Sequence, residues 1–217
     1  MPLWFVHLRV ADGLLDHIKN TDAESFIVGN IAPDCGTPCG GGRYEPPKYI
    51  THWQEPQTRK SRMDEFFTKY LAGNNVCADT SFYLGYYVHL YTDELWKALV
   101  YYPVRDKNID SFGSLQELNQ KIREDWVDTE FLQLKDDPNL RAFSIFKGIT
   151  SFKNRFFSYY PENAFERRIE DMKAFYSRKR EPVEREHPYF DKNMADDFVK
   201  TAGEKIKNDL KSRKIIY

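Results

Sequence analysis

The chain has 217 residues, of which 41% are hydrophobic and 16% aromatic, and this length and composition predict one domain with a substantial apolar core. Its 32 Lys and Arg residues nearly balance 33 Asp and Glu residues, so the chain lacks the basic excess that is typical of nucleic-acid-binding proteins. The sequence has no secretory signal and no run of about 18 apolar residues, and its three cysteines are an odd number; we therefore expect a cytoplasmic protein with reduced thiols and no transmembrane helix.

The first part of the chain predicts two helices. In residues 3–18, apolar side chains recur every three or four positions, as in an amphipathic helix. The next helix should begin at a capping box formed by Thr21 and Glu24, whose side chains would each satisfy a free backbone amide. It should end near Ala32, because Pro33 disfavours a helical residue before it.

Residues 33–60 are rich in Gly and Pro and show no periodicity, which predicts a long loop. Loops of this length in compact domains are usually functional or mobile. Beyond the loop, Ser61 should cap a helix over residues 61–73. Residues 79–104 are apolar nearly all round and predict a central, buried helix that ends at Pro103.

Helical periodicity continues through the second half of the chain, and the charged stretch 177–190 predicts a linker or exposed turn. No strand pairs are evident. We therefore predict an all-α, multi-helix bundle in one domain over residues 1–217. The remaining helices are expected at residues 114–133, 139–150, 162–178 and 191–213.

One histidine and one aspartate interrupt the apolar segment LGYYVHLYTDELW, at His89 and Asp93. Four residues apart on a helix, they share a face one turn apart. A buried aspartate without a partner costs several kcal/mol when it is charged. The pair therefore predicts either a single His–Asp hydrogen bond in the core or part of a metal site.

Three further residues are candidate metal ligands. His7 lies on or beside the apolar face of the first helix, Asp34 follows the end of the second, and His52 lies near the end of the long loop. Zinc binds imidazole and carboxylate groups, commonly three or four of them from separate segments. The other two histidines, His17 and His187, have polar neighbours and should be exposed.

The order, residue types and contexts of four segments resemble those of the zinc-dependent phospholipase C family, which is related in fold to the P1-type nucleases. The resemblance covers about the first 100 residues and implies an all-α fold around a cluster of zinc ions. The four segments are HLRVAD (7–12), GNIAPD (29–34), TH (51–52) and GYYVHLYTDELW (85–96).

The resemblance implies ligands for two zinc ions. In that family, Asp93 would bridge the first ion to a second, which His7 and a main-chain group at the N-terminus would also hold. The third zinc of the family needs two more histidines and a glutamate, but only His187 follows the HxxxD helix; we therefore expect one or two ions. The first ion would be bound by Asp34, His52, His89 and Asp93.

The chemistry implied is hydrolysis of a phosphodiester by metal-activated water, because zinc lowers the pKa of its bound water to near 7. Asp34, as ligand or neighbour, would take the proton from that water. Arg9, Arg43 or Lys48 could replace part of the charge of the missing third ion. A small phosphodiester or a phospholipid head group would be the substrate, and the sequence does not identify the residues that bind it.

Two alternatives to this enzyme differ in class. The missing third set of ligands favours a non-catalytic helical protein whose degenerate site binds a metal or a ligand. An all-α phosphohydrolase of the HD type would need adjacent His and Asp residues in that order, and the sequence contains no such dipeptide. The first alternative therefore stays open beside the phosphodiester hydrolase.

Overall fold

The computed structural model describes residues 2–74, 76–178 and 185–216. With 64% helix and 3% strand, it confirms the all-α class. In the part of the chain described, no helix combines the length and the apolar character needed to cross a bilayer. The elements are α1 (Trp4–Leu15), α2 (Ala23–Ile31), η1 (Ala32–Asp34), β1 (Thr37–Pro38), β2 (Tyr44–Glu45), α3 (Lys48–Thr51), α4 (Met63–Tyr70), α5 (Ala78–Trp96), η2 (Lys97–Tyr101), α6 (Tyr102–Asn108), η3 (Ile109–Ser111), α7 (Leu115–Asp136), α8 (Arg141–Gly148), α9 (Ala164–Tyr176) and α10 (Lys192–Ser212).

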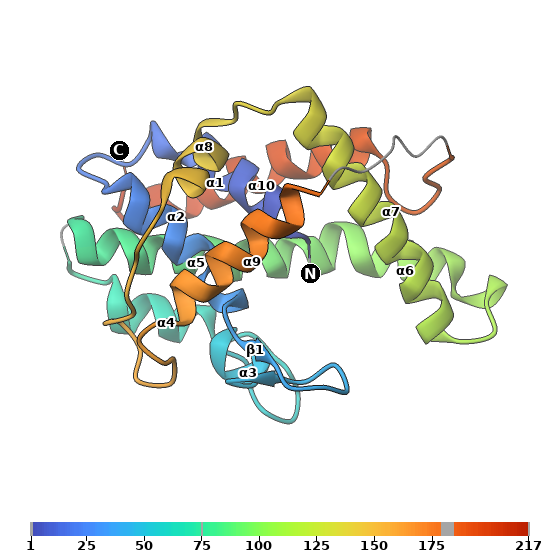
Figure 1. The fold of residues 1–217 in the computed structure, drawn as a ribbon, viewed down its shortest axis with the longest axis horizontal. Coiled ribbons are helices and arrows are strands. Elements are labelled where there is room, and N and C mark those ends of the chain that lie inside the picture. The colour runs from blue at the N-terminus through green and yellow to red at the C-terminus, as the bar shows by residue number, and fades with distance from the viewer. Residues whose placement is uncertain (1, 75, 179–184, 217) are drawn as a thin grey trace.

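Helix α5 runs through the middle of the molecule, and α2 packs closely against it (Figure 1). Two glycines permit this approach. A Cβ atom at Gly29 would lie 2.0 Å from the carbonyl oxygen of Phe82, and one at Gly85 would lie 2.0 Å from that of Phe26. Since neither distance is tolerable for a larger residue, the close α2–α5 crossing depends on glycine at both positions.

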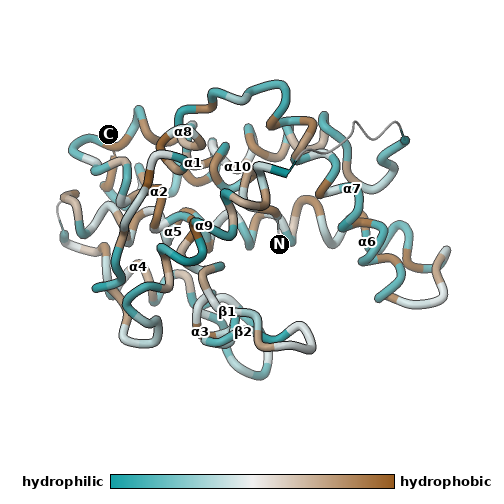
Figure 2. The backbone as a smooth tube through the Cα atoms, viewed as in Figure 1, coloured by the Kyte–Doolittle hydropathy of each residue, from teal (hydrophilic) through white to brown (hydrophobic). Residues whose placement is uncertain are grey.

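Helices α1, α8 and α10 complete the core around α2 and α5. Hydrophobic stretches gather on the central helices, whereas α7 and α9 carry long hydrophilic stretches (Figure 2). The aromatic residues of α5 are part of this core: Tyr86, Tyr87 and Trp96 are fully buried. The predicted central position of this helix is thus confirmed.

The predicted end of that helix at Pro103 is wrong. After Trp96 the chain continues through a turn of π-helix, η2, directly into α6, and Pro103 lies in the first turn of α6. Proline is tolerated in a first turn because its missing N–H needs no partner there. The change of helix type at η2 therefore accommodates the proline without ending the helical run.

Two predicted caps also differ from the structure. The N-cap of α2 is Asp22, whose carboxylate accepts a hydrogen bond from the Ser25 amide at 2.7 Å, instead of the Thr21–Glu24 box. Helix α4 begins at Met63, and the Ser61 hydroxyl accepts from its amide at 3.3 Å from just outside the helix. At α2, Asp22 therefore replaces the predicted box. At α4, the predicted Ser61 does satisfy a free amide, but the helix begins two residues later than predicted.

The loop predicted over residues 33–60 contains more structure than expected. A two-residue hairpin pairs β1 with β2, and a single helical turn, α3, follows; the expectation of no strand pairs was wrong to this extent. These elements project from one edge of the molecule beside α4 (Figure 1). In the charged stretch 177–190, residues 179–184 lie outside the described part of the chain.

Candidate metal centre

His89 and Asp93 both lie in α5 and are almost completely buried, with 0% and 2% of their surfaces exposed. The His89 Nε2 and Asp93 Oδ2 atoms are 3.8 Å apart, which is too far for a hydrogen bond. The other ring nitrogen, His89 Nδ1, lies 2.7 Å from the carbonyl oxygen of Asn30. The pair is therefore not the simple His–Asp hydrogen bond that the sequence left open.

The fold brings the five predicted ligands together from four elements. Helix α1 supplies His7, the end of η1 supplies Asp34, and the residue after α3 supplies His52. Two sets of donor atoms each lie within 4.8 Å of one another, and His89 belongs to both. The sets are His7, His89 and Asp93, and Asp34, His52 and His89.

Apart from those of Asp34, the donor atoms of this site lack ordinary hydrogen-bond partners. Among the described residues, none forms a hydrogen bond with Nε2 of His7, His52 or His89, and none with either carboxylate oxygen of Asp93. Buried polar atoms without partners are rare, because each costs desolvation free energy. A cation between these atoms would satisfy them together.

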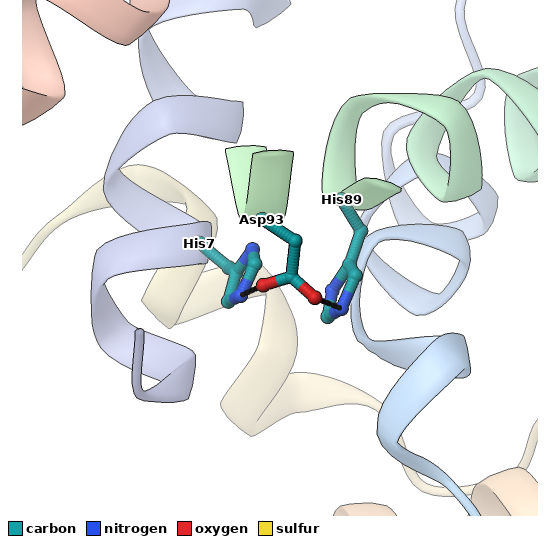
Figure 3. A group of neighbouring side chains, drawn as sticks. All are labelled: His7, His89 and Asp93. Carbon is teal, nitrogen blue, oxygen red and sulfur yellow. Dashed lines mark ion pairs between the residues drawn. The ribbon is translucent and has the colours of Figure 1, made fainter. Parts of the chain in front are cut away.

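The two carboxylate oxygens of Asp93 lie near different imidazoles. Its Oδ1 atom lies 3.5 Å from His7 Nε2, and its Oδ2 atom lies 3.6 Å from His52 Nε2. The carboxylate points between His7 and His89 in Figure 3. This is the arrangement of a carboxylate that could contact two ions, one through each oxygen.

Backbone and hydroxyl groups orient two of the three imidazoles, those of His89 and His52. With Nδ1–H donating to the Asn30 carbonyl, Nε2 of His89 carries a lone pair that faces the site. His52 Nδ1 lies 2.9 Å from the Thr51 hydroxyl, which in turn donates to the Lys48 carbonyl at 3.4 Å. That chain of donors again leaves Nε2 as the inward, unprotonated atom.

The protonation states also suit a cation. Burial, together with the neighbouring His7, lowers the pKa of His89 to about 3, so its imidazole is neutral at pH 7. Burial would raise the pKa of Asp93, but the adjacent histidines outweigh it and hold the pKa below its usual range. Neutral imidazoles and ionised carboxylates are the forms that bind metal ions.

Asp34 is the most exposed of the five candidate ligands, with 8% of its surface exposed. Its Oδ2 accepts a hydrogen bond from Trp4 Nε1 at 3.1 Å, and its Oδ1 lies 3.3 Å from Lys48 Nζ and 3.5 Å from His52 Nε2. Burial would raise the pKa of Asp34, but Lys48 and His52 outweigh it and hold the pKa well below its usual range. Asp34 is therefore ionised at the edge of the site.

Some predicted residues lie elsewhere. The Arg9 guanidinium pairs with Asp196 at 2.8 Å and does not supply charge to the site. His17 is exposed, as expected. His187 is not: its side chain is only 11% exposed and lies 3.6 Å from Asp128, because α7 packs beside it. Met1 lies outside the described residues, so the structure does not place the main-chain group expected on the second ion.

The structure adds three residues that the sequence did not identify as part of the site. Asn30 acts through its backbone carbonyl, for which the side chain gives no signal. Thr51 directly precedes His52, and Trp4 lies one helical turn before His7. A polar residue beside a candidate ligand, or an indole one helical turn away, is a weak sequence signal for a residue that supports the ligand.

No family model, curated protein or solved structure matches the chain. The class of this protein is therefore described from its fold and its candidate metal site alone. It is an all-α protein with a buried cluster of histidine and aspartate side chains that could hold a metal ion.

Proposed function

We propose that the chain is a zinc-dependent phosphodiester hydrolase with a bundle of the phospholipase C/P1 nuclease type. One observation carries the proposal: the buried, partnerless donor atoms of His7, His52, His89 and Asp93 converge beside Asp34. Imidazole and carboxylate are the ligands zinc takes in catalytic sites. The resemblance of four sequence segments to that family supports the same assignment.

The ligand set suits one or two ions. Asp34, His52 and His89 form one group of close donor atoms, and His7 and Asp93 form the other with His89. The two carboxylates carry two negative charges against the four positive charges of two divalent ions, so the site would keep a net positive charge that attracts a phosphodiester anion. Asp93, with one oxygen toward each side, is the bridging ligand of the proposal.

Bound zinc would supply a nucleophilic water of lowered pKa and would polarise a phosphoryl oxygen. Asp34 and Lys48 are the residues of the chain that would assist this reaction. Asp34 is ionised and hydrogen-bonded by Trp4, so its carboxylate has a fixed orientation beside the proposed ions. In the proposal, it takes the proton from the water. Lys48 lies beside that oxygen and places a positive charge where a phosphate would approach.

A second candidate is a non-catalytic protein in which a metal ion stabilises the helix bundle. The depth of the site favours it, since His7 and His89 are fully buried and Asp93 is 2% exposed. Structural metal sites are closed, whereas catalytic sites keep a position open to substrate. On this alternative, Asp34 would be a ligand only.

The first experiment measures metal content by elemental analysis of protein purified without added metal. We expect about one to two zinc ions per chain, and nearly none in His89→Ala and Asp93→Ala. His17→Ala is the matched control, because His17 is exposed and is not one of the candidate ligands. Metal-free wild-type protein would contradict the proposed site.

The second experiment separates the two candidates. Hydrolysis of bis-p-nitrophenyl phosphate is measured with and without chelator, in wild type and in Asp34→Asn. Chelator-sensitive turnover that falls in Asp34→Asn supports the hydrolase. A protein that holds zinc but shows no such turnover supports the non-catalytic alternative.

A further inference from the structure

A pocket of about 630 Å³ opens beside the candidate metal centre, between the β1–β2 hairpin and α3. It does not contain the five candidate ligands. Its lining includes three basic side chains, Arg43, Lys48 and Arg59, and one acidic side chain, Glu45. A concave surface with this balance of charge favours an anion.

Aromatic rings position two of these cations. Lys48 Nζ lies 4.9 Å from the centre of the Tyr44 ring, and the Arg59 guanidinium lies 5.1 Å from that of Tyr49. Such a contact holds a cation in place without neutralising its charge, although Lys48 also pairs with Asp34 at 3.3 Å. Among the described residues, no carboxylate lies within 4.0 Å of the Arg43 or Arg59 guanidinium.

A single helical turn links the pocket to the metal centre. Helix α3 begins with Lys48, which lines the pocket, and the next residue after the helix is His52, which faces the site. The His52 amide donates to the Lys48 carbonyl at 2.8 Å, and Lys48 Nζ reaches Asp34 Oδ1 at 3.3 Å. One molecule could therefore touch both places.

We propose that this pocket binds a second anionic group of the substrate, so that the preferred substrate is a small phosphodiester that also carries a phosphate monoester. The inference rests on the proposed hydrolase activity and specifies its substrate class. Arg43 and Arg59 supply forked guanidinium donors, which match the geometry of phosphate oxygens. A cationic head group would be repelled from the same position.

The kinetic test compares two substrates that differ by one phosphate: thymidine 5′-(p-nitrophenyl phosphate) and its 3′-phosphorylated form. The wild type should show a KM about tenfold lower for the 3′-phosphorylated substrate, equivalent to about 1.4 kcal/mol. The double variant Arg43→Gln/Arg59→Gln should lose this preference, so that the two substrates have equal KM values.

The matched control is Arg105→Gln/Arg123→Gln, which removes the same charge from the half-exposed Arg105 of α6 and the exposed Arg123 of α7. It should retain the preference. Equal KM values for the two substrates in the wild type, or a preference that survives in Arg43→Gln/Arg59→Gln, would overturn the inference.

A second readout does not depend on turnover. Arginines of the protein as purified are modified with phenylglyoxal, with and without inorganic pyrophosphate, and quantified by mass spectrometry. Pyrophosphate should slow modification of Arg43 and Arg59 several-fold and leave Arg105 and Arg123 unchanged. Protection without hydrolysis of either substrate would refute the hydrolase but support the anion pocket, whereas hydrolysis without selective protection would refute the pocket alone.

Discussion

Replacing Gly85 by alanine should disrupt the metal centre from a distance. The added Cβ would lie 2.0 Å from the Phe26 carbonyl oxygen, whereas ordinary contacts begin near 3.4 Å. Helices α2 and α5 must therefore separate by more than about 1 Å. Metal–ligand distances tolerate only about 0.2 Å, and the 2.7 Å hydrogen bond from His89 to Asn30 spans the same two helices.

We expect Gly85→Ala to lose at least about 1–3 kcal/mol of stability, as in other overpacked cores, or roughly 2–12 °C in Tm for a chain of this size. Zinc content should fall well below that of the wild type. The assays are thermal unfolding by circular dichroism and elemental analysis at a temperature where the variant is folded.

Gly203→Ala is the matched control, because no atom beyond its chain neighbours and the adjacent backbone of α10 lies within 4 Å of its added Cβ. It should bind zinc normally and gain about 0.5–1 kcal/mol of stability, since alanine has the higher helix propensity. A Gly85→Ala protein with the Tm and zinc content of the wild type would refute the argument that the glycine crossing positions the ligands.

Three further predictions concern the site and its support. Trp4→Phe removes the hydrogen bond to Asp34 Oδ2 and should weaken zinc affinity about tenfold; a competition titration with a zinc indicator measures this, and an unchanged affinity would contradict the role of the indole. Removal of metal by chelator should lower stability by about 4 kcal/mol if free zinc had been near 1,000 times its Kd, seen as a lower Tm that added zinc restores; a Tm indifferent to chelator would argue against a bound ion. Glu130 accepts hydrogen bonds from the Phe5 amide and, at 2.8 Å, from the Tyr176 hydroxyl, and burial raises its pKa from 4.5 to about 8. Its carboxyl is then protonated in the folded chain but ionised in the unfolded chain between these pH values, so stability should fall by up to about 1.4 kcal/mol per pH unit as the pH rises through that window. In urea unfolding, the stability of Glu130→Gln should lack this decrease with rising pH. Parallel profiles of stability against pH for the two proteins would contradict the assignment of the decrease to Glu130.

Local sequence patterns predicted most of the helices but not their ends. The periodicity of residues 3–18 corresponds to α1, and the apolar run after residue 79 corresponds to α5. The continuation past Pro103 was missed, because a turn of π-helix is favoured by tertiary packing and leaves no periodic signal of its own. The hairpin and α3 inside the long loop were missed for a similar reason, since elements of two to four residues are too short for a period.

The sequence by itself determined which side chains are chemically equipped to bind a metal. Five histidine and aspartate residues in apolar or loop contexts were recognisable from residue type and spacing. Only the tertiary structure decided that they meet, because their separation depends on the Gly29–Gly85 crossing and on the turn of α3, which join segments far apart in the chain. The orientation of His89 likewise depends on the Asn30 carbonyl, and a backbone group has the same chemistry in every residue.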